Sequence, residues 1–69
     1  MPALAPYRLY DPRRRDVIGG YLNEAEAREE AARLVADGEY GKIEIQHLED
    51  GLSGYGYYRI DSVASEVEW

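Results

Sequence analysis

The 69-residue sequence contains no cysteine, no phenylalanine and only one histidine. Without cysteine, disulfide bridges and thiolate metal sites cannot form. Small secreted domains usually depend on such cross-links, so we expect a protein of the reducing cytoplasm. The chain also lacks the roughly 18 successive apolar residues that a membrane-spanning helix needs. No charged segment followed by an apolar run marks residues 1–7 as a signal peptide, and we expect no membrane association.

The length of the chain limits the interior that it can build. A domain of this size buries only about 60% of the surface that its unfolded chain exposes, which leaves little room for a deep catalytic cleft. We therefore expect residues 1–69 to form one domain that acts through its surface. Fourteen acidic residues against eight basic ones give a net charge of −6. This charge opposes DNA, RNA and anionic lipid; it favours a basic protein partner, or serves solubility alone.

Hydrophobic periodicity predicts the element order β-β-α-β-β. Alternating apolar residues predict strands over 7–11, 16–22, 42–48 and 55–63, and the Gly- and Pro-free stretch 24–37 predicts a helix. Asn23 is a good N-cap for this helix, and Gly38 can take the left-handed conformation that follows its end. The Gly19-Gly20 pair predicts a bulge or bend in the second strand. The composition of residues 49–54 predicts a turn.

Strands joined by short connections pair antiparallel. The expected fold class is therefore α+β, with a four-stranded antiparallel sheet and one helix packed on one of its faces. At about 100° per residue, the core stripe of the helix consists of Ala27, Ala31, Leu34 and Val35. The opposite, mostly acidic side carries Glu26, Glu29, Glu30, Arg33 and Asp37. Three arrangements remain for the tail 64–69: it extends the last strand, it forms an additional edge strand, or it covers the sheet.

The sequence contains few side chains that are candidates for catalysis. His47 lacks partners for a triad, and alternation places it on the face of Ile43 and Ile45, at the edge of the core. No serine lies in a nucleophile-elbow pattern, and no glycine-rich phosphate loop ends in Lys-Ser/Thr. Acid–base catalysis needs a carboxylate in a desolvated pocket, whereas the adjacent pairs Glu29-Glu30 and Glu49-Asp50 are expected in solvent. We predict no catalytic residue, metal site or cofactor, and thus no enzyme.

Aromatic residues are a stronger indication of function, because the chain has seven tyrosines and one tryptophan. Alternation puts Tyr55, Tyr57, Arg59 and Asp61 on one face of the last strand, away from the helix, and Tyr58 and Ile60 on the other. Tyrosine and arginine on an open sheet face are typical of protein interface hot spots. The same side chains can stack nucleotide bases, or can form cross-strand pairs that only stabilise an exposed sheet.

Three consecutive arginines, Arg13, Arg14 and Arg15, fall in the connection between the first two strands. At a hairpin tip they can contact phosphate groups or an acidic protein surface. The alternative is that they are simply solvated, and the net charge of −6 opposes nucleic acid.

The layout of the chain resembles that of small acidic phage-encoded inhibitors, including anti-CRISPR proteins. The resemblance covers a first hairpin, the acidic capped helix around residues 23–38, and the aromatic hairpin over residues 40–69. It implies a protein that occupies the nucleic-acid groove or a subunit interface of its target. No residue motif is shared, so the resemblance assigns no functional residues.

Three functional hypotheses follow. In the first, the chain is a non-catalytic protein-binding module that inhibits a nucleic-acid-handling complex, with Glu26, Glu29, Glu30 and Asp37 meeting a basic patch. In the second, it associates with nucleic acid through Arg13–Arg15, Tyr57 and Arg59. In the third, it is a structural homodimer joined through its open sheet or its edge strand.

Overall fold

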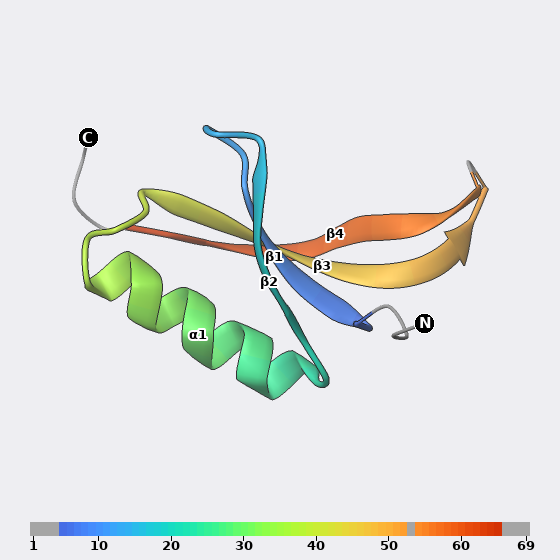
Figure 1. The fold of residues 1–69 in the computed structure, drawn as a ribbon, viewed down its shortest axis with the longest axis horizontal. Coiled ribbons are helices and arrows are strands. Elements are labelled where there is room, and N and C mark those ends of the chain that lie inside the picture. Colours follow the sequence, from blue (N-terminus) through green and yellow to red (C-terminus); the bar gives the residue numbers. More distant parts are fainter. Residues whose placement is uncertain (1–4, 53, 66–69) are drawn as a thin grey trace.

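The computed structural model describes residues 5–52 and 54–65 of the chain (Figure 1). The elements are β1 (Tyr7–Asp11), β2 (Asp16–Tyr21), α1 (Glu24–Ala36), β3 (Lys42–Gly51) and β4 (Gly54–Ala64). The strands form one antiparallel sheet in the order β2-β1-β3-β4, and α1 packs against all of them. The predicted α+β fold class is confirmed. Among the described residues, no helix has the length and apolarity to cross a membrane.

The ends of α1 follow from local hydrogen bonding. The Asn23 side chain accepts a hydrogen bond of 2.8 Å from the backbone N–H of Glu26, which satisfies one of the unpaired donors of the first turn. Asp37 caps the other end, and Gly38 follows it with φ of 82°, a backbone conformation that favours glycine. The predicted helix is therefore confirmed, with its last predicted residue acting as the cap.

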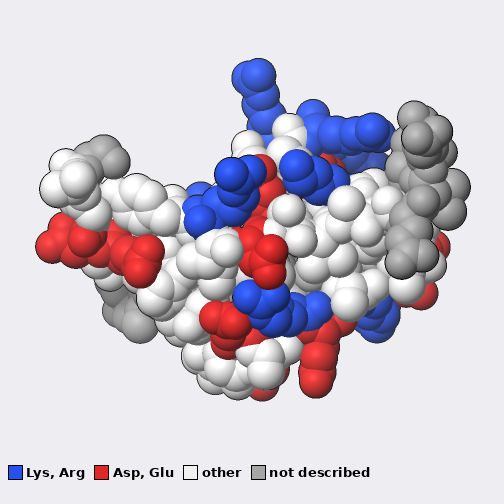
Figure 2. Space-filling view, turned by 180° about the vertical axis from the view of Figure 1, so that it is seen from behind, with Lys and Arg blue, Asp and Glu red and all other residues white. Residues whose placement is uncertain are grey.

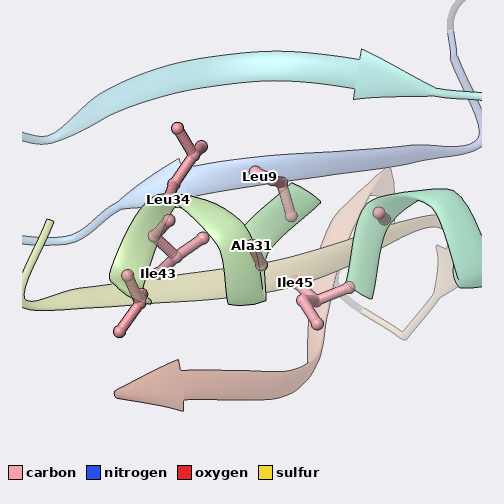
Figure 3. Packing of buried hydrophobic residues seen from close by; sticks show 7 residues of the cluster. Leu9, Ala31, Leu34, Ile43 and Ile45 are labelled. Carbon is pink, nitrogen blue, oxygen red and sulfur yellow. The ribbon is translucent and has the colours of Figure 1, made fainter. Parts of the chain in front are cut away.

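The core lies between α1 and one face of the sheet (Figure 3). Leu9, Ile43 and Ile45 are fully buried on the central strands β1 and β3. From the helix they meet the predicted stripe, whose members are all buried: Ala27, Ala31, Leu34 and Val35. Because two of these helical residues are alanines, the helix backbone can approach the sheet closely. Half-buried side chains from β1, β2, β4 and the α1–β3 connection surround this cluster: Tyr7, Ile18, Tyr21, Tyr40 and Val63.

Two bulges break the regular pairing of the sheet. In β2, Leu9 pairs with Gly19 and Tyr10 pairs with Val17, so Ile18 is the extra residue. The predicted irregularity beside Gly19 is thus confirmed. In β4, Ile45 pairs with Asp61 and Gln46 pairs with Arg59, which makes Ile60 an extra residue that the sequence did not predict.

The bulge in β4 corrects the predicted faces of that strand. Directly opposite residues share a face, so Asp61, opposite Ile45, lies on the helix side and not beside Arg59. The Arg28 Nη1 atom of α1 donates a hydrogen bond of 2.5 Å to its Oδ2. Ile60, expected to point inward with Tyr58, is 40% exposed. The uninterrupted alternation assumed from the sequence was wrong at this one position.

The second hairpin is longer than predicted. β3 continues to Gly51 and pairs there with Gly54, so residues 49–51 belong to a strand and not to a turn. At the other end, the Ser65 N–H donates to the Gly41 carbonyl at 2.9 Å, and the last strand extends to Ala64. Of the three positions considered for the tail, extension of the strand is correct for residue 64. Residues 66–69 lie outside the described part of the chain.

The central position of Ile45 leads to a stability prediction. Ile45→Ala removes apolar atoms from a fully buried site and leaves a cavity, because the paired neighbouring strands cannot move in to fill it. We expect a loss of about 2–5 kcal/mol in the free energy of unfolding. Urea denaturation followed by circular dichroism measures it. Val17→Ala, at a site that is 45% exposed, should change stability by less than about 0.5 kcal/mol. Equal effects of the two substitutions would contradict the placement of the core.

Candidate protein-interaction surfaces

The sheet face opposite α1 carries a connected polar network. Arg8, Gln46 and Arg59 lie side by side across β1, β3 and β4. The Arg8 Nε atom donates to the Gln46 Oε1 atom at 2.6 Å, and the Gln46 Nε2 atom donates to the Glu44 Oε1 atom at 3.4 Å. The Arg59 Nη1 atom lies 3.9 Å from the Glu44 Oε2 atom. Of the two guanidinium groups on this face, that of Arg59 lies near a carboxylate, whereas that of Arg8 contacts the neutral amide of Gln46.

Tyr57 is held firmly on the same face. The Arg8 guanidinium lies 3.9 Å from the centroid of its ring, in the range of a cation–π contact. Its hydroxyl donates a hydrogen bond of 2.6 Å to the Ala5 carbonyl. The structure thus places the predicted Tyr57 and Arg59 on the face away from the helix, as expected. It adds Arg8, which the sequence argument missed because β1 was not known to lie beside β3.

The distal half of the β3–β4 hairpin extends beyond the rest of the sheet. β1 pairs with β3 between Glu44 and His47, and the Leu48 N–H still donates to the Pro6 carbonyl. Beyond this point, residues 49–51 pair only with residues 54–56 of β4. We name residues 48–57 the ribbon, of which residue 53 is not described. In Figure 1 the ribbon leaves the helix-covered part of the sheet at the right. Its shape places the predicted interface residue Tyr55 far from the core.

The end of the ribbon exposes apolar and acidic side chains together. Leu52 is fully exposed, and Tyr55 is 68% exposed. Glu49 and Asp50 are exposed on the adjoining part of β3, and Figure 2 shows acidic side chains gathered at this end of the molecule. The sequence indicated only a turn here, so Leu52 was missed as a candidate contact residue; its position between two glycines of a tight hairpin was the available signal.

His47, the only histidine of the sequence, lies directly before the ribbon. The ring of His47 stacks on that of Tyr7, with 4.5 Å between centroids, and its Nδ1 atom lies 3.5 Å from the Glu49 Oε1 atom. Both side chains are partly exposed, so no carboxylate is enclosed beside the imidazole. His47 lies at the edge of the core, as predicted. Within residues 5–52 and 54–65, no three side chains gather as candidate metal ligands.

The predicted acidic face of α1 divides into two kinds of carboxylate. Glu30 and Asp37 both contact the guanidinium of Arg33. The hydrogen bond from Arg33 holds the pKa of Glu30 below its ordinary value, and the charge of Arg33 adds to this effect. The side chains of Glu26 and Glu29 are exposed and form no hydrogen bond or ion pair with any other described residue. Only the latter two are fully available to a partner.

The arginine turn between β1 and β2 is ordered by one buried carboxylate. Asp11 is only 4% exposed, and its Oδ1 atom accepts hydrogen bonds from the backbone N–H groups of Arg13 and Arg14, at 2.9 and 3.3 Å. The Arg14 Nε atom lies 3.6 Å from the other oxygen. Arg15 has φ of 54°, a left-handed conformation that closes the turn. The turn is therefore held by hydrogen bonds and an ion pair among its own residues.

The three arginines project from the tip of this turn, where Figure 2 shows basic side chains at the top. A hollow of about 310 Å³ lies below them and is lined by Asp11, Arg13, Arg14, Gly38, Glu39, Tyr40 and Gly41. Arg14 lies over Tyr40, with 5.4 Å to the ring centroid. Arg13 and Arg15 form no ion pair with the described part of the chain. The turn is remote from the acidic end of the ribbon.

Comparisons with protein-family models, with curated proteins and with solved structures found no match to this chain.

Two ion pairs predict how stability depends on pH. Hydrogen bonds lower the pKa of Asp61, first from Arg28 and then from the Ser62 N–H, and Arg33 lowers that of Glu30. Because the folded values lie below the ordinary values of 3.8 and 4.5, the pairs stabilise the fold above those pH values. Their contribution disappears as pH falls through the lowered folded values. We expect urea midpoints to decrease from pH 5 to pH 2.

Arg28→Ala and Arg33→Ala test this assignment. Each variant should show a shallower loss of the urea midpoint on acidification than the parent chain. The difference should shrink in about 1 M NaCl, where the Debye length is only about 3 Å and exposed pairs are screened. Identical pH profiles for the parent chain and both variants would contradict the role of these pairs.

Proposed function

We propose that the chain is a non-catalytic protein-binding module that inhibits a nucleic-acid-handling protein complex by covering a basic patch on it. The observation that carries this proposal is the ribbon, with Leu52 and Tyr55 exposed beside Glu49 and Asp50. An isolated two-stranded hairpin is marginally stable in water. A chain this small that still extends such a hairpin, and places apolar groups at its end, has the form of a binding element.

The contact chemistry of the ribbon suits a pocket with a basic rim. Buried anchors of an interface are commonly aromatic or large apolar groups, whereas charges at the rim orient the approach. Leu52 and Tyr55 supply the anchors, and Glu49 and Asp50 supply the charges. Basic grooves with apolar floors are what nucleic-acid-handling proteins offer to single strands. The acidic ribbon would enter such a groove in place of the nucleic acid.

The alternative, direct binding of nucleic acid, has weaker support. It requires a free aromatic face for base stacking, but one face of the Tyr57 ring is covered by the Arg8 guanidinium at 3.9 Å. Arg59 lies near Glu44, which reduces its charge toward phosphate. The uncompensated Arg13 and Arg15 remain the best phosphate contacts, yet the net charge of the chain is −6.

The ribbon proposal predicts a specific effect of one leucine. Leu52→Asp should weaken binding to a partner captured from the native cell by at least about 30-fold, as expected for loss of a hot-spot anchor. Leu22→Asp is the matched control, since Leu22 is 79% exposed but lies just before α1, away from the ribbon. Surface plasmon resonance on the purified partner measures both affinities. Equal affinities for the two variants would rule out the ribbon as the anchor.

The inhibitory role has its own readout. Added at increasing ratios, the parent chain should abolish nucleic-acid binding by the purified partner at one chain per site, while Leu52→Asp should not. A partner that binds the chain and still binds its nucleic acid would contradict inhibition but leave the binding module intact.

The acidic helix residues lead to a separate prediction. Glu26→Lys with Glu29→Lys should lower the association rate of the complex about tenfold or more at low salt, with little change in the dissociation rate, because exposed charges mainly steer the encounter. The effect should vanish in about 1 M NaCl, where the Debye length is about 3 Å. Glu30→Lys is unsuitable as a control, since it also breaks the contact with Arg33. An unchanged association rate would exclude the helix face from the encounter.

A further inference from the structure

The outer edge of β4 is an unusually open strand edge. β4 is the outermost strand, runs for 11 residues from Gly54 to Ala64, and has no strand beside its outer edge in the described part of the chain. Proteins commonly protect such edges with lysine, proline or short strands. β4 contains neither lysine nor proline, and its bulge at Ile60 interrupts only the second half. The other edge strand, β2, is shorter, with six residues.

The direction of the free backbone groups follows from one hydrogen bond. The Leu48 N–H donates to the Pro6 carbonyl at 2.9 Å, so it points away from β4. Leu48 pairs with Tyr57. Because the backbone groups of Leu48 point away from β4, this is one of the non-hydrogen-bonded pairs of the antiparallel ladder. The N–H and C=O of Tyr57 therefore point outward from the sheet. Alternation gives Tyr55 and Arg59 the same direction, up to the bulge.

We propose that two copies of the chain associate by antiparallel pairing of β4, with Tyr57 opposite Tyr57 of the second copy. This pairing uses backbone groups that no other strand in residues 5–52 and 54–65 pairs with, and it does not rest on the proposed inhibitory function. It is isologous, so the same residues serve in both copies and the assembly closes as a dimer.

The side chains of β4 are complementary to themselves in this register. Tyr55 lies opposite Arg59 of the second copy, which brings a guanidinium beside an exposed aromatic ring on each side of the symmetry axis. On the other face, Gly56 lies opposite Tyr58 of the second copy. A Cβ atom at Gly56 would meet nothing within 4 Å, so this position has room for a neighbouring aromatic ring, which commonly covers glycine in paired strands.

Two other symmetric registers of the same segment are less favourable. Centring the pair on Arg59 sets the two guanidinium groups opposite each other and brings the bulge at Ile60 into the ladder. Centring it on Tyr55 reaches the end of the hairpin within two residues. The register at Tyr57 also directs the two hairpin ends to opposite sides of the axis, with Gly54 of one copy six positions, or about 20 Å, from Gly54 of the other along the strands at 3.4 Å per residue.

The dimer would double the sheet without covering its open face. Opposite residues share a face in antiparallel pairing, so both Arg8–Tyr57 contacts lie on one side and both helices on the other. The ends of the two ribbons stay exposed and point in opposite directions.

Because the chain lacks cysteine, single-cysteine variants report the register directly. In a mixture of Tyr55→Cys and Arg59→Cys, the two introduced thiols belong to opposite residues of a hydrogen-bonded pair, whose Cα atoms lie about 5.5 Å apart, within the range of a disulfide. In a dimer of either variant with itself, the two thiols lie four positions apart, at about 14 Å, beyond that range. Under mild oxidation, the mixed disulfide should form at least about tenfold faster than either homodisulfide, as measured by mass spectrometry.

Light scattering over a concentration series gives the independent measurement. The parent chain should approach twice its monomer mass of 7.9 kDa. Tyr55→Pro removes an outward N–H that the β3–β4 ladder does not use, and should raise the dimer dissociation constant at least about tenfold, because two symmetric hydrogen bonds are lost. Circular dichroism verifies that the variant folds. A strict monomer up to about 1 mM, or a mixture that forms no excess of mixed disulfide, would overturn the proposal.

Discussion

The structure depends on the contact between the small face of α1 and the branched side chains of β1 and β3. Ala27 and Ala31 bring the helix backbone close to Leu9, Ile43 and Ile45, and all five side chains are fully buried. One helix of 13 residues can cover only part of a sheet whose longest strands have 10 and 11 residues. The uncovered face and the protruding ribbon are therefore consequences of how the core is built, and both candidate interaction surfaces originate there.

The bulge at Ile60 lets β4 serve both sides of the sheet. Without the extra residue, Asp61 would share the open face with Tyr57 and Arg59. With it, Asp61 turns toward α1 and bonds Arg28, while Arg59 stays near Glu44. The strand is thereby tied to α1 near its C-terminal end, whereas its N-terminal half extends past the helix into the ribbon (Figure 1). A single inserted residue separates the half of β4 that contacts α1 from the half that we propose to pair with a second copy.

Local sequence signals predicted the elements well, and long-range pairing limited the rest. The N-cap Asn23, Gly38 and the alanine-rich stripe each act within a few residues, so the helix and its buried face could be derived directly. Tyr55, Tyr57 and Arg59 could be placed on the open face because alternation holds up to the bulge. Arg8 could not be joined to them, because the β1–β3 pairing connects residues 38 positions apart, such as Arg8 and Gln46. The ribbon was missed because Glu49, Asp50 and Gly51 have the composition of a turn; their pairing with β4 overrides that preference.

The distribution of charge would orient the approach of the chain to a basic surface. On the open sheet face, Arg59 lies near Glu44, whereas Arg8 contacts the neutral Gln46 amide and the Tyr57 ring. Exposed acids without an ion pair to another described residue include Asp50 near the end of the ribbon and Glu26 and Glu29 on α1, whereas Arg13 and Arg15 project from the β1–β2 turn, next to the exposed Asp16. A basic surface would attract the former and repel the latter. Steering of this kind selects orientation before contact, so the exposed Leu52 and Tyr55 would arrive first and the arginine turn would remain on the far side.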